Sequence, residues 1–175
     1  TKADYVLFLD DDAILEKETI QAMIEVLQEH PDIGCAAPLI VYYDMPNTIW
    51  CAGVKHDFWT TMGMMRRPLG GGGLLEHGKV DNGQLKGIID CDGVATVFLV
   101  PASIARRFPF DSRVFPIGWE DLDFCTKIGR AGYRVVVIPS ARALHDYHQP
   151  NWLGSSEQRL YYDVRNRVIF HARWS

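Results

Sequence analysis

Apolar positions follow two different periods in the first part of the chain. Val6–Leu9 and Ile33–Ile40 are unbroken apolar runs with the length of buried strands. Between them, apolar residues recur at helical spacing at Ile20, Met23, Ile24 and Leu27. This helix is expected to end near His30-Pro31, because proline disfavours helical backbone in the residue before it. A strand, a helix and a second strand in succession predict an α/β domain.

The second half of the chain continues this alternation. We expect a strand over Val94–Val100, a short helix near Ser103–Arg107 and a strand over Tyr133–Ile138. The longer helix between them carries Leu122, Cys125 and Ile128 and stops at Ala131-Gly132. The stretch from Val41 to Ile89 is less regular, and its glycine run and turn signal lie at Gly70–Gly73 and Asp81-Asn82-Gly83.

A last helix is expected from about Glu157 to Ala172. It has an apolar stripe formed by Leu160, Val164 and Val168. It also carries four arginines, which are Arg159, Arg165, Arg167 and Arg173. These arginines could place the helix on an anionic membrane surface, such as the inner face of a membrane. The simpler interpretation is a helix that docks through its apolar stripe and leaves a basic face in water.

Size and charge narrow the classes of protein that fit. The 175 residues suit one domain over 1–175, and the net charge of -4 disfavours nonspecific nucleic-acid binding. The four cysteines show no C-x-x-C spacing and read as reduced core thiols of a cytoplasmic protein. There is no secretory signal and no apolar run that could span a bilayer. The chain starts at Thr1 with a strand close behind, which suggests a piece of a longer protein.

Two acidic clusters are the first candidate chemistry. Asp10-Asp11-Asp12 follows the first strand, and Glu120-Asp121-Leu122-Asp123 opens a helix. Ligands of open α/β sheets bind beyond the carboxyl ends of strands, and hard divalent cations prefer carboxylate oxygens. Asp10 and Asp12 are therefore candidate holders of a metal–phosphate assembly, with Asp11 as a solvent-facing spacer. The plainer interpretation of both clusters is solvated acids at helix starts, where the helix dipole favours them.

Two further residues fit a shared site with these acids. His145 could complete a mixed carboxylate and imidazole set, which suits Mn²⁺ in particular. His148, three residues later, is a weaker candidate. Trp119 stands directly before the second cluster and could stack on a sugar face or simply pack. Each residue taken alone is more often structural, so the hypothesis depends on their convergence.

The chain resembles family-2 glycosyltransferases, in particular their rhamnosyltransferase-like branch. The resemblance rests on "YVLFLDDDAILEKETI", "HPDIGCAAPLI", "IWCAGVKHDFWT", "GWEDLDFCTKIGRAGYRVVVIPSARALH" and "RLYYDVRNRVIFHA". These stretches follow the family order, and the segment from Trp119 to His145 is the most specific of them. The resemblance implies the C-terminal part of a glycosyltransferase A-type, Rossmann-like fold, with a mixed sheet flanked by helices. The resemblance also implies an N-terminal βαβ region that holds the nucleotide base, and we expect this chain to lack it.

The resemblance also implies a reaction and roles for individual residues. Asp10 and Asp12 match the D-x-D motif, which binds the donor nucleotide and a Mn²⁺ or Mg²⁺ ion, and His145 matches a further ligand of that metal. Asp121, with Glu120 beside it, matches the base that deprotonates an acceptor hydroxyl. The donor would be a nucleotide-diphosphate sugar, and the acceptor a saccharide or a lipid-linked molecule shaped in part by Trp119. Polysaccharide or glycoconjugate synthesis, in the cytoplasm or at the inner membrane face, is the setting that the family implies.

Three alternatives stay open on the sequence. A haloacid-dehalogenase-type, Mg²⁺-dependent phosphatase also begins with a strand ending in D-x-D, but its pattern D-x-D-G-T is broken here at Ala13-Ile14. A non-catalytic carbohydrate-binding fragment would also suit a chain without a nucleotide-binding half. A chain lacking that half could also pair with a second copy and have weak or no transferase activity by itself.

Overall fold

The computed structural model describes residues 2–56, 74–146 and 156–174. The strands and helices of these residues follow in the order β1 (Tyr5–Leu9), β2 (Ala13–Leu15), α1 (Thr19–Glu29), β3 (Ile33–Tyr42), β4 (Ile49–Cys51), β5 (Ile89–Cys91), β6 (Val97–Pro101), α3 (Ala102–Arg107), α4 (Glu120–Arg130), β7 (Arg134–His145) and α5 (Ser156–Trp174). The alternation of strands and helices agrees with the α/β class expected from the sequence.

All the strands belong to one mixed sheet. Its main path runs β1-β6-β3-β7-β2, while β4 pairs with β3 and β5 pairs with β7. The long strands β3 and β7 are parallel, and the pairs β1·β6, β6·β3 and β7·β2 are antiparallel. The carboxyl ends of β1, β3 and β7 therefore lie on the same side of the molecule, where ligands of α/β sheets bind.

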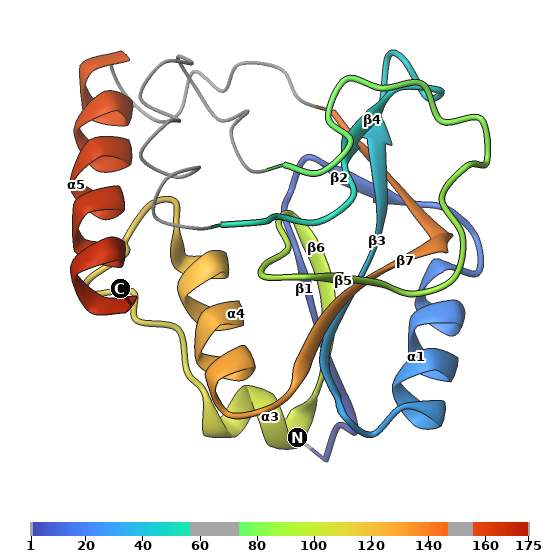
Figure 1. Ribbon diagram of the computed structural model, residues 1–175, viewed down its shortest axis with the longest axis horizontal. Helices are drawn as coiled ribbons and strands as arrows, with labels where there is room; N and C mark the ends of the chain where they lie inside the picture. The colour runs from blue at the N-terminus through green and yellow to red at the C-terminus, as the bar shows by residue number, and fades with distance from the viewer. Residues whose placement is uncertain (1, 57–73, 147–155, 175) are drawn as a thin grey trace.

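Helices cover both faces of this sheet, with α1 on one side and α3 and α4 on the other (Figure 1). The two-residue period of the strands explains this arrangement. In β3, Cys35 and Ala37 pack in the cluster that contains Phe124 of α4, while Ala36 packs in the cluster that contains Met23 of α1. All three strand residues are buried, so β3 is apolar along both faces, as strands between two helical layers are.

Several predictions from the sequence are confirmed in this fold. The helix at residues 19–29, the strand from Ile33 and the helix after Trp119 lie where the apolar periodicity placed them. All four cysteines are free and buried, as expected for reduced core thiols. The glycine run at residues 70–73 and His148 lie outside the described residues.

The residue ranges expected for several strands were wrong. β7 continues to His145, well beyond the end expected at Ile138, and His145 is a buried strand residue. The irregular stretch contains the short strand β4 and leads into β5, and β2 follows Asp12 directly. These strands have three residues each, which is too short for periodicity to reveal.

The orientation of α5 is also opposite to the expected one. The side chains of its predicted apolar stripe are exposed, with 60% exposure at Leu160, 41% at Val164 and 60% at Val168. Among the side chains of this helix that the structure describes, the buried ones are Asn166, Arg167, Phe170 and His171. Helix α5 thus contacts the domain through a mainly polar face. None of the helices in the described ranges is long and apolar enough to cross a membrane.

Candidate active site

The first acidic cluster lies at the turn where β1 leaves the sheet. The backbone N–H of Asp10 donates to the carbonyl of Thr96 at 2.9 Å, just before β6 begins. The chain turns through Asp11, which is exposed, and Ala13 then enters β2. The solvent-facing position expected for Asp11 agrees with this geometry.

The register of β2 with β7 brings Asp12 next to His145. Ala13 is paired with His145 across the two strands, and the N–H of Asp146 donates to the carbonyl of Asp12 at 2.8 Å. The His145 Nε2 atom lies 3.3 Å from Asp12 Oδ1. The imidazole is buried and meets the Trp50 ring edge-on, with 4.3 Å between the centroids. Burial lowers the pKa of His145 despite the neighbouring carboxylate, which favours the neutral imidazole that a metal requires.

The second acidic cluster lies in the first turn of α4. Gly118 and Trp119 precede this helix with φ angles of 70° and 74°, and Trp119 occupies the N-cap position. A left-handed conformation is ordinary for glycine but costs energy at a bulky side chain such as tryptophan. This sharp entry turns Glu120 and Asp121 inward, and the positive end of the helix dipole favours their negative charge.

The fold brings the two clusters into one electrostatic neighbourhood. Burial, with the charges of Asp12, Glu120 and Asp11, raises the pKa of Asp10 to about 6, although its side chain keeps contact with solvent. Burial, with the charges of Glu120 and Asp10, raises the pKa of Asp121 well above its usual range. The pKa of Glu120 is also raised, mainly by burial. These carboxylates destabilise one another when ionised, so a bound cation would stabilise their charged forms.

The donor set fits a divalent cation, although it is not a complete metal site. No group of three or more His, Cys, Asp or Glu side chains in the described part of the chain is arranged to hold a metal ion by itself. Carboxylates from Asp10 and Asp12 and the imidazole of His145 are nevertheless ligand types of Mn²⁺. The buried Glu120 Oε2 atom has no hydrogen-bond partner among the described residues, which is a further unsatisfied acceptor near this cluster. Hard cations commonly complete their coordination with water and substrate phosphate.

Helix α5 holds the loop that leads into the second cluster. Asn166 is fully buried, and its Nδ2 atom donates to the carbonyls of Ile117 at 2.8 Å and Gly118 at 3.0 Å. Trp119 donates from Nε1 to Asp163 at 3.2 Å and packs against Phe170. Its side chain therefore has a structural role here, and its expected contact with an acceptor sugar stays a prediction.

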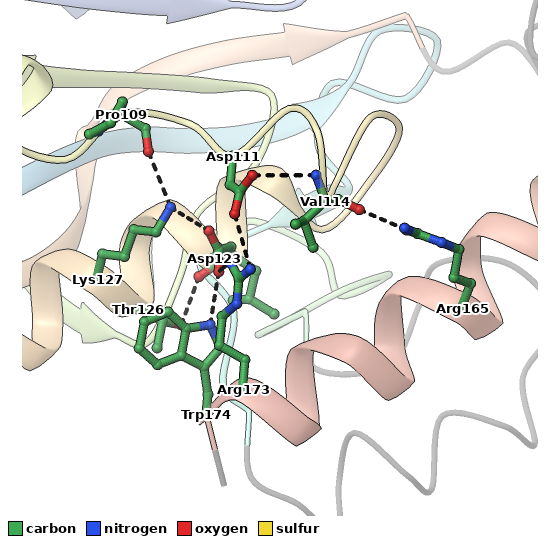
Figure 2. A network of polar contacts seen from close by, with 10 residues as sticks. Pro109, Asp111, Val114, Asp123, Thr126, Lys127, Arg165, Arg173 and Trp174 are labelled. Carbon is green, nitrogen blue, oxygen red and sulfur yellow. Dashed lines mark hydrogen bonds and ion pairs between the residues drawn. The ribbon is translucent and has the colours of Figure 1, made fainter.

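A second group of contacts fixes the other end of α5, as Figure 2 shows. Asp123, which is 1% exposed, accepts from Arg173 at 3.1 Å and from Trp174 Nε1 at 2.9 Å, and it pairs with Lys127 at 2.6 Å. Arg173 also bonds Asp111 at 3.0 Å, and Arg165 donates to the Val114 carbonyl at 2.7 Å (Figure 2). Three of the arginines expected on a solvated basic face, Arg165, Arg167 and Arg173, are thus engaged with protein groups.

Sequence reasoning missed three residues of this region. Asn166 sits between charged and apolar neighbours in a helix, and Asp123 was interpreted only as a helix-terminus acid. Thr96 contacts both acidic clusters from a backbone conformation with φ of 67°, which is rare for a β-branched residue. Ile169 and Phe170, three and four residues after Asn166, share its helix face and are the sequence signal for its burial. Nothing in one sequence marks Thr96.

Comparisons with known proteins bear on the family and the fold of the chain. Residues 1–79 match the model of glycosyl transferase family 2. The family resemblance read from the sequence is thereby confirmed, while the rhamnosyltransferase-like branch stays a prediction. This family match includes the D-x-D turn and ends before Thr96 and α4. No curated protein matches the chain in sequence.

The fold is shared with proteins of known structure. One is the crystal structure of GalNAc-T7 with UDP, GalNAc and Mn²⁺, with a TM-score of 0.60 and 16% sequence identity. The similarity covers 93% of this chain and 31% of that one, so the chain spans about a third of the length of that protein. The expected glycosyltransferase A-type fold is thus confirmed.

Proposed function

We propose that this chain carries the catalytic acids of a metal-dependent glycosyltransferase, which moves a sugar from a nucleotide-diphosphate sugar to a hydroxyl acceptor. The observation that carries the proposal is the convergence of Asp10 and Asp12 with Glu120 and Asp121 at one end of the sheet. The match to glycosyl transferase family 2 and the shared fold favour this reaction over phosphate-ester hydrolysis. The setting that we propose is polysaccharide or glycoconjugate synthesis.

In this proposal the D-x-D turn and the end of β7 bind the nucleotide-diphosphate sugar through a metal ion. Asp12, Asp10 and His145 would hold Mn²⁺ or Mg²⁺; Asp12 lies against His145 at the end of β7, and Asp10 follows the end of β1. When bound, the cation neutralises the charge that develops on the diphosphate leaving group. The neutral state of His145 suits this role, because a protonated imidazole has no free lone pair for a metal.

Asp121 is the proposed general base. The acceptor oxygen forms a bond to the anomeric carbon, the bond from that carbon to the diphosphate oxygen breaks, and Asp121 takes the hydroxyl proton. The raised pKa of Asp121 suits this step, since a carboxylate with a pKa nearer the working pH is a stronger base. Glu120, with its own raised pKa, supports the negative potential around Asp121. A single displacement of this kind inverts the anomeric centre.

Binding and transfer measurements test the two halves of the proposal separately. Thermal-shift screening of nucleoside diphosphates should give a stabilisation that requires both the nucleotide and Mn²⁺, and Asp12→Ala should remove it. Absence of a shift for every nucleotide and metal pair would contradict the donor site. Where transfer to a saccharide is detected, Asp121→Asn should abolish turnover while the shift with nucleotide and Mn²⁺ remains. Hydrolysis of an aryl phosphate with Mg²⁺, lost in Asp10→Asn, would instead favour a phosphatase.

A further inference from the structure

Thr96 lies at the centre of a strained three-residue turn directly before β6. The N–H of Val97 donates to the carbonyl of Ala95 at 2.7 Å, and Thr96 between them has a φ angle of 67°. This combination is a γ-turn of the rare form with positive φ. Strain at a β-branched residue persists only where the surroundings require it, and such strain concentrates at functional sites. Thr96 is also 4% exposed, so the turn is part of the interior.

Three polar groups of Thr96 are used by the two acidic clusters. Its carbonyl accepts the N–H of Asp10 at 2.9 Å, and its side chain forms a hydrogen bond with the Asp10 carboxylate. A backbone hydrogen bond from Thr96 lowers the pKa of the Asp121 carboxyl, against the larger raising effect of burial. The positive φ turns these groups toward both clusters at once. The ends of β1 and α4, which are far apart in sequence, are therefore bridged by a single residue.

The loop before Thr96 is also built for a close approach to α4. Leu122, the residue after Asp121, packs against Gly93. A Cβ atom at Gly93 would lie 2.4 Å from Leu122 Cδ1, so Leu122 would have to move to make room for a side chain there. The same loop is anchored on its other side, because the N–H of Val54 donates to the Gly93 carbonyl at 2.8 Å. Gly93 thus allows the loop to lie against the first turn of α4.

We propose that Thr96 is a positioning residue, which fixes the carboxylates of Asp10 and Asp121 relative to each other through its strained turn. The inference deepens the proposed function and rests on it, because it assigns one residue to align the donor-binding motif with the base. When no substrate is bound, hydrogen-bond donors on Thr96 offset part of the repulsion between the two carboxylates. The strained backbone is retained because a relaxed one would point these donors elsewhere.

Three substitutions separate the contributions of Thr96. Thr96→Gly removes the hydroxyl and relieves the strain, because glycine adopts positive φ freely. Thr96→Val keeps the side-chain shape and the strain but removes the hydroxyl. Thr96→Ser keeps the hydroxyl. The matched control is Glu18→Gly, which relieves a φ of 75° at an exposed residue directly before α1 that belongs to neither acidic cluster.

The first measurement is affinity for a nucleoside diphosphate with Mn²⁺, accompanied by the melting temperature of each variant. We expect Thr96→Gly to melt no lower than the natural chain and yet to bind at least tenfold more weakly. Thr96→Val should also bind more weakly, while Thr96→Ser and Glu18→Gly should bind normally. Equal affinity of the natural chain and both the Gly and Val variants would overturn the inference and leave the proposed function standing.

A second measurement does not depend on nucleotide binding. Hydrogen exchange of the Asp10 amide reports its bond to the Thr96 carbonyl, which requires the strained turn. Glycine keeps the positive φ without strain, so protection of the Asp10 amide should be unchanged in Thr96→Gly and in Glu18→Gly. Thr96→Pro, whose ring excludes positive φ, should redirect the carbonyl and make the Asp10 amide exchange faster. If the natural chain binds no nucleotide, the proposed function fails, but unchanged protection of Asp10 in Thr96→Pro would still overturn the positioning role. In an active preparation, Thr96→Val should lower kcat more than it raises the KM for the acceptor.

Discussion

The indole N–H of Trp174 donates to the Asp123 carboxylate at 2.9 Å, which ties the last turn of α5 to a buried acid of α4. The same carboxylate accepts from Arg173 and pairs with Lys127. Asp123 is therefore the point at which the C-terminal helix is attached to the helix that carries Glu120 and Asp121. Loss of this attachment should affect both stability and the site.

The first prediction concerns that carboxylate. Asp123→Ala should lower the free energy of unfolding by about 2 kcal/mol, because two cations and an indole donor lose a buried partner. The value is below that of a fully buried pair, since Lys127 and Arg173 keep 20% and 29% side-chain exposure. Urea denaturation measures the change. Asp32→Ala is the control: Asp32 pairs with Arg134 at an exposed position, so its loss should change the free energy of unfolding much less than the loss of Asp123.

The second prediction concerns Asn166. Asn166→Ala should cost about 2 kcal/mol, because the carbonyls of Ile117 and Gly118 lose their donor. The entry to α4 should also loosen, so affinity for a nucleoside diphosphate with Mn²⁺ should fall beyond what reduced folding explains. Val168→Ala on the exposed face of the same helix should leave both quantities unchanged. Equal effects of the two substitutions would contradict a special role for Asn166.

The third prediction concerns charge repulsion at the D-x-D turn. The pKa of Asp10 is about 6 in the folded chain and 3.8 without the fold's influence. A carboxyl with a raised folded pKa binds protons more tightly in the folded state, so its contribution to stability is lost as pH rises from about 4 to 6. Asp10→Asn should therefore raise the melting temperature at pH 7 without divalent ions, by about 3 °C once solvent screening is allowed for.

The same pair of proteins gives the metal dependence. Addition of Mn²⁺ with a nucleoside diphosphate should stabilise the natural chain and have little effect on Asp10→Asn, which would reverse their order of stability. Asp11→Asn, at the exposed middle position, should respond to the ligands like the natural chain. A natural chain that is more stable than Asp10→Asn at pH 7 without metal would show that the carboxylates do not repel as described.

The fourth prediction concerns pH and α5. Burial, with the positive charge of Arg167, lowers the pKa of His171 below 6.5. Because the unfolded state then binds the proton more readily, stability should decrease as pH falls below 6.5 toward the lowered folded pKa. Denaturation curves between pH 7 and pH 5 should show this slope, and His171→Gln should reduce it. The slope that remains in His171→Gln should come from His145, whose pKa is also lowered by burial. A slope that is identical in His171→Gln would exclude His171 as its source.

The sequence predicted the parts of the fold that depend on long periodic segments. Apolar runs located β1, β3 and β6, and helical spacing located α1 and α4. The short strands β2, β4 and β5 escaped, because three residues carry no period and their pairing with distant strands decides their conformation. The buried face of α5 was misread for a related reason. Its inner surface meets polar backbone groups of residues 114–118, so Asn166 and Arg165 contact the domain while the apolar stripe faces outward.

The sequence predicted the acidic residues of the candidate site, but it did not predict the contacts that link the two acidic clusters. Two acidic clusters at element boundaries indicated a shared location, and the fold brings Asp10 close to Glu120 and Asp121. The bridging role of Thr96 depends on a φ angle of 67°, which no propensity would assign to threonine. Contacts that rest on unfavourable local conformations are invisible in a single sequence, because local preference argues against them.

The pairing of β3 with β7 contains an irregularity on which the position of His145 depends. Ile138 is paired with Pro38, but the next residue, Leu39, is paired with Arg142, so residues 139–141 form an insertion within the strand. Alternate residues of a strand point to opposite faces of the sheet. The insertion therefore determines which face each later residue of β7 points to. Deletion of a single residue there would turn His145 away from Asp12 while every functional residue stayed in the sequence. A change of strand register at residues 139–141, outside the candidate site, is therefore expected to separate two of the proposed metal ligands.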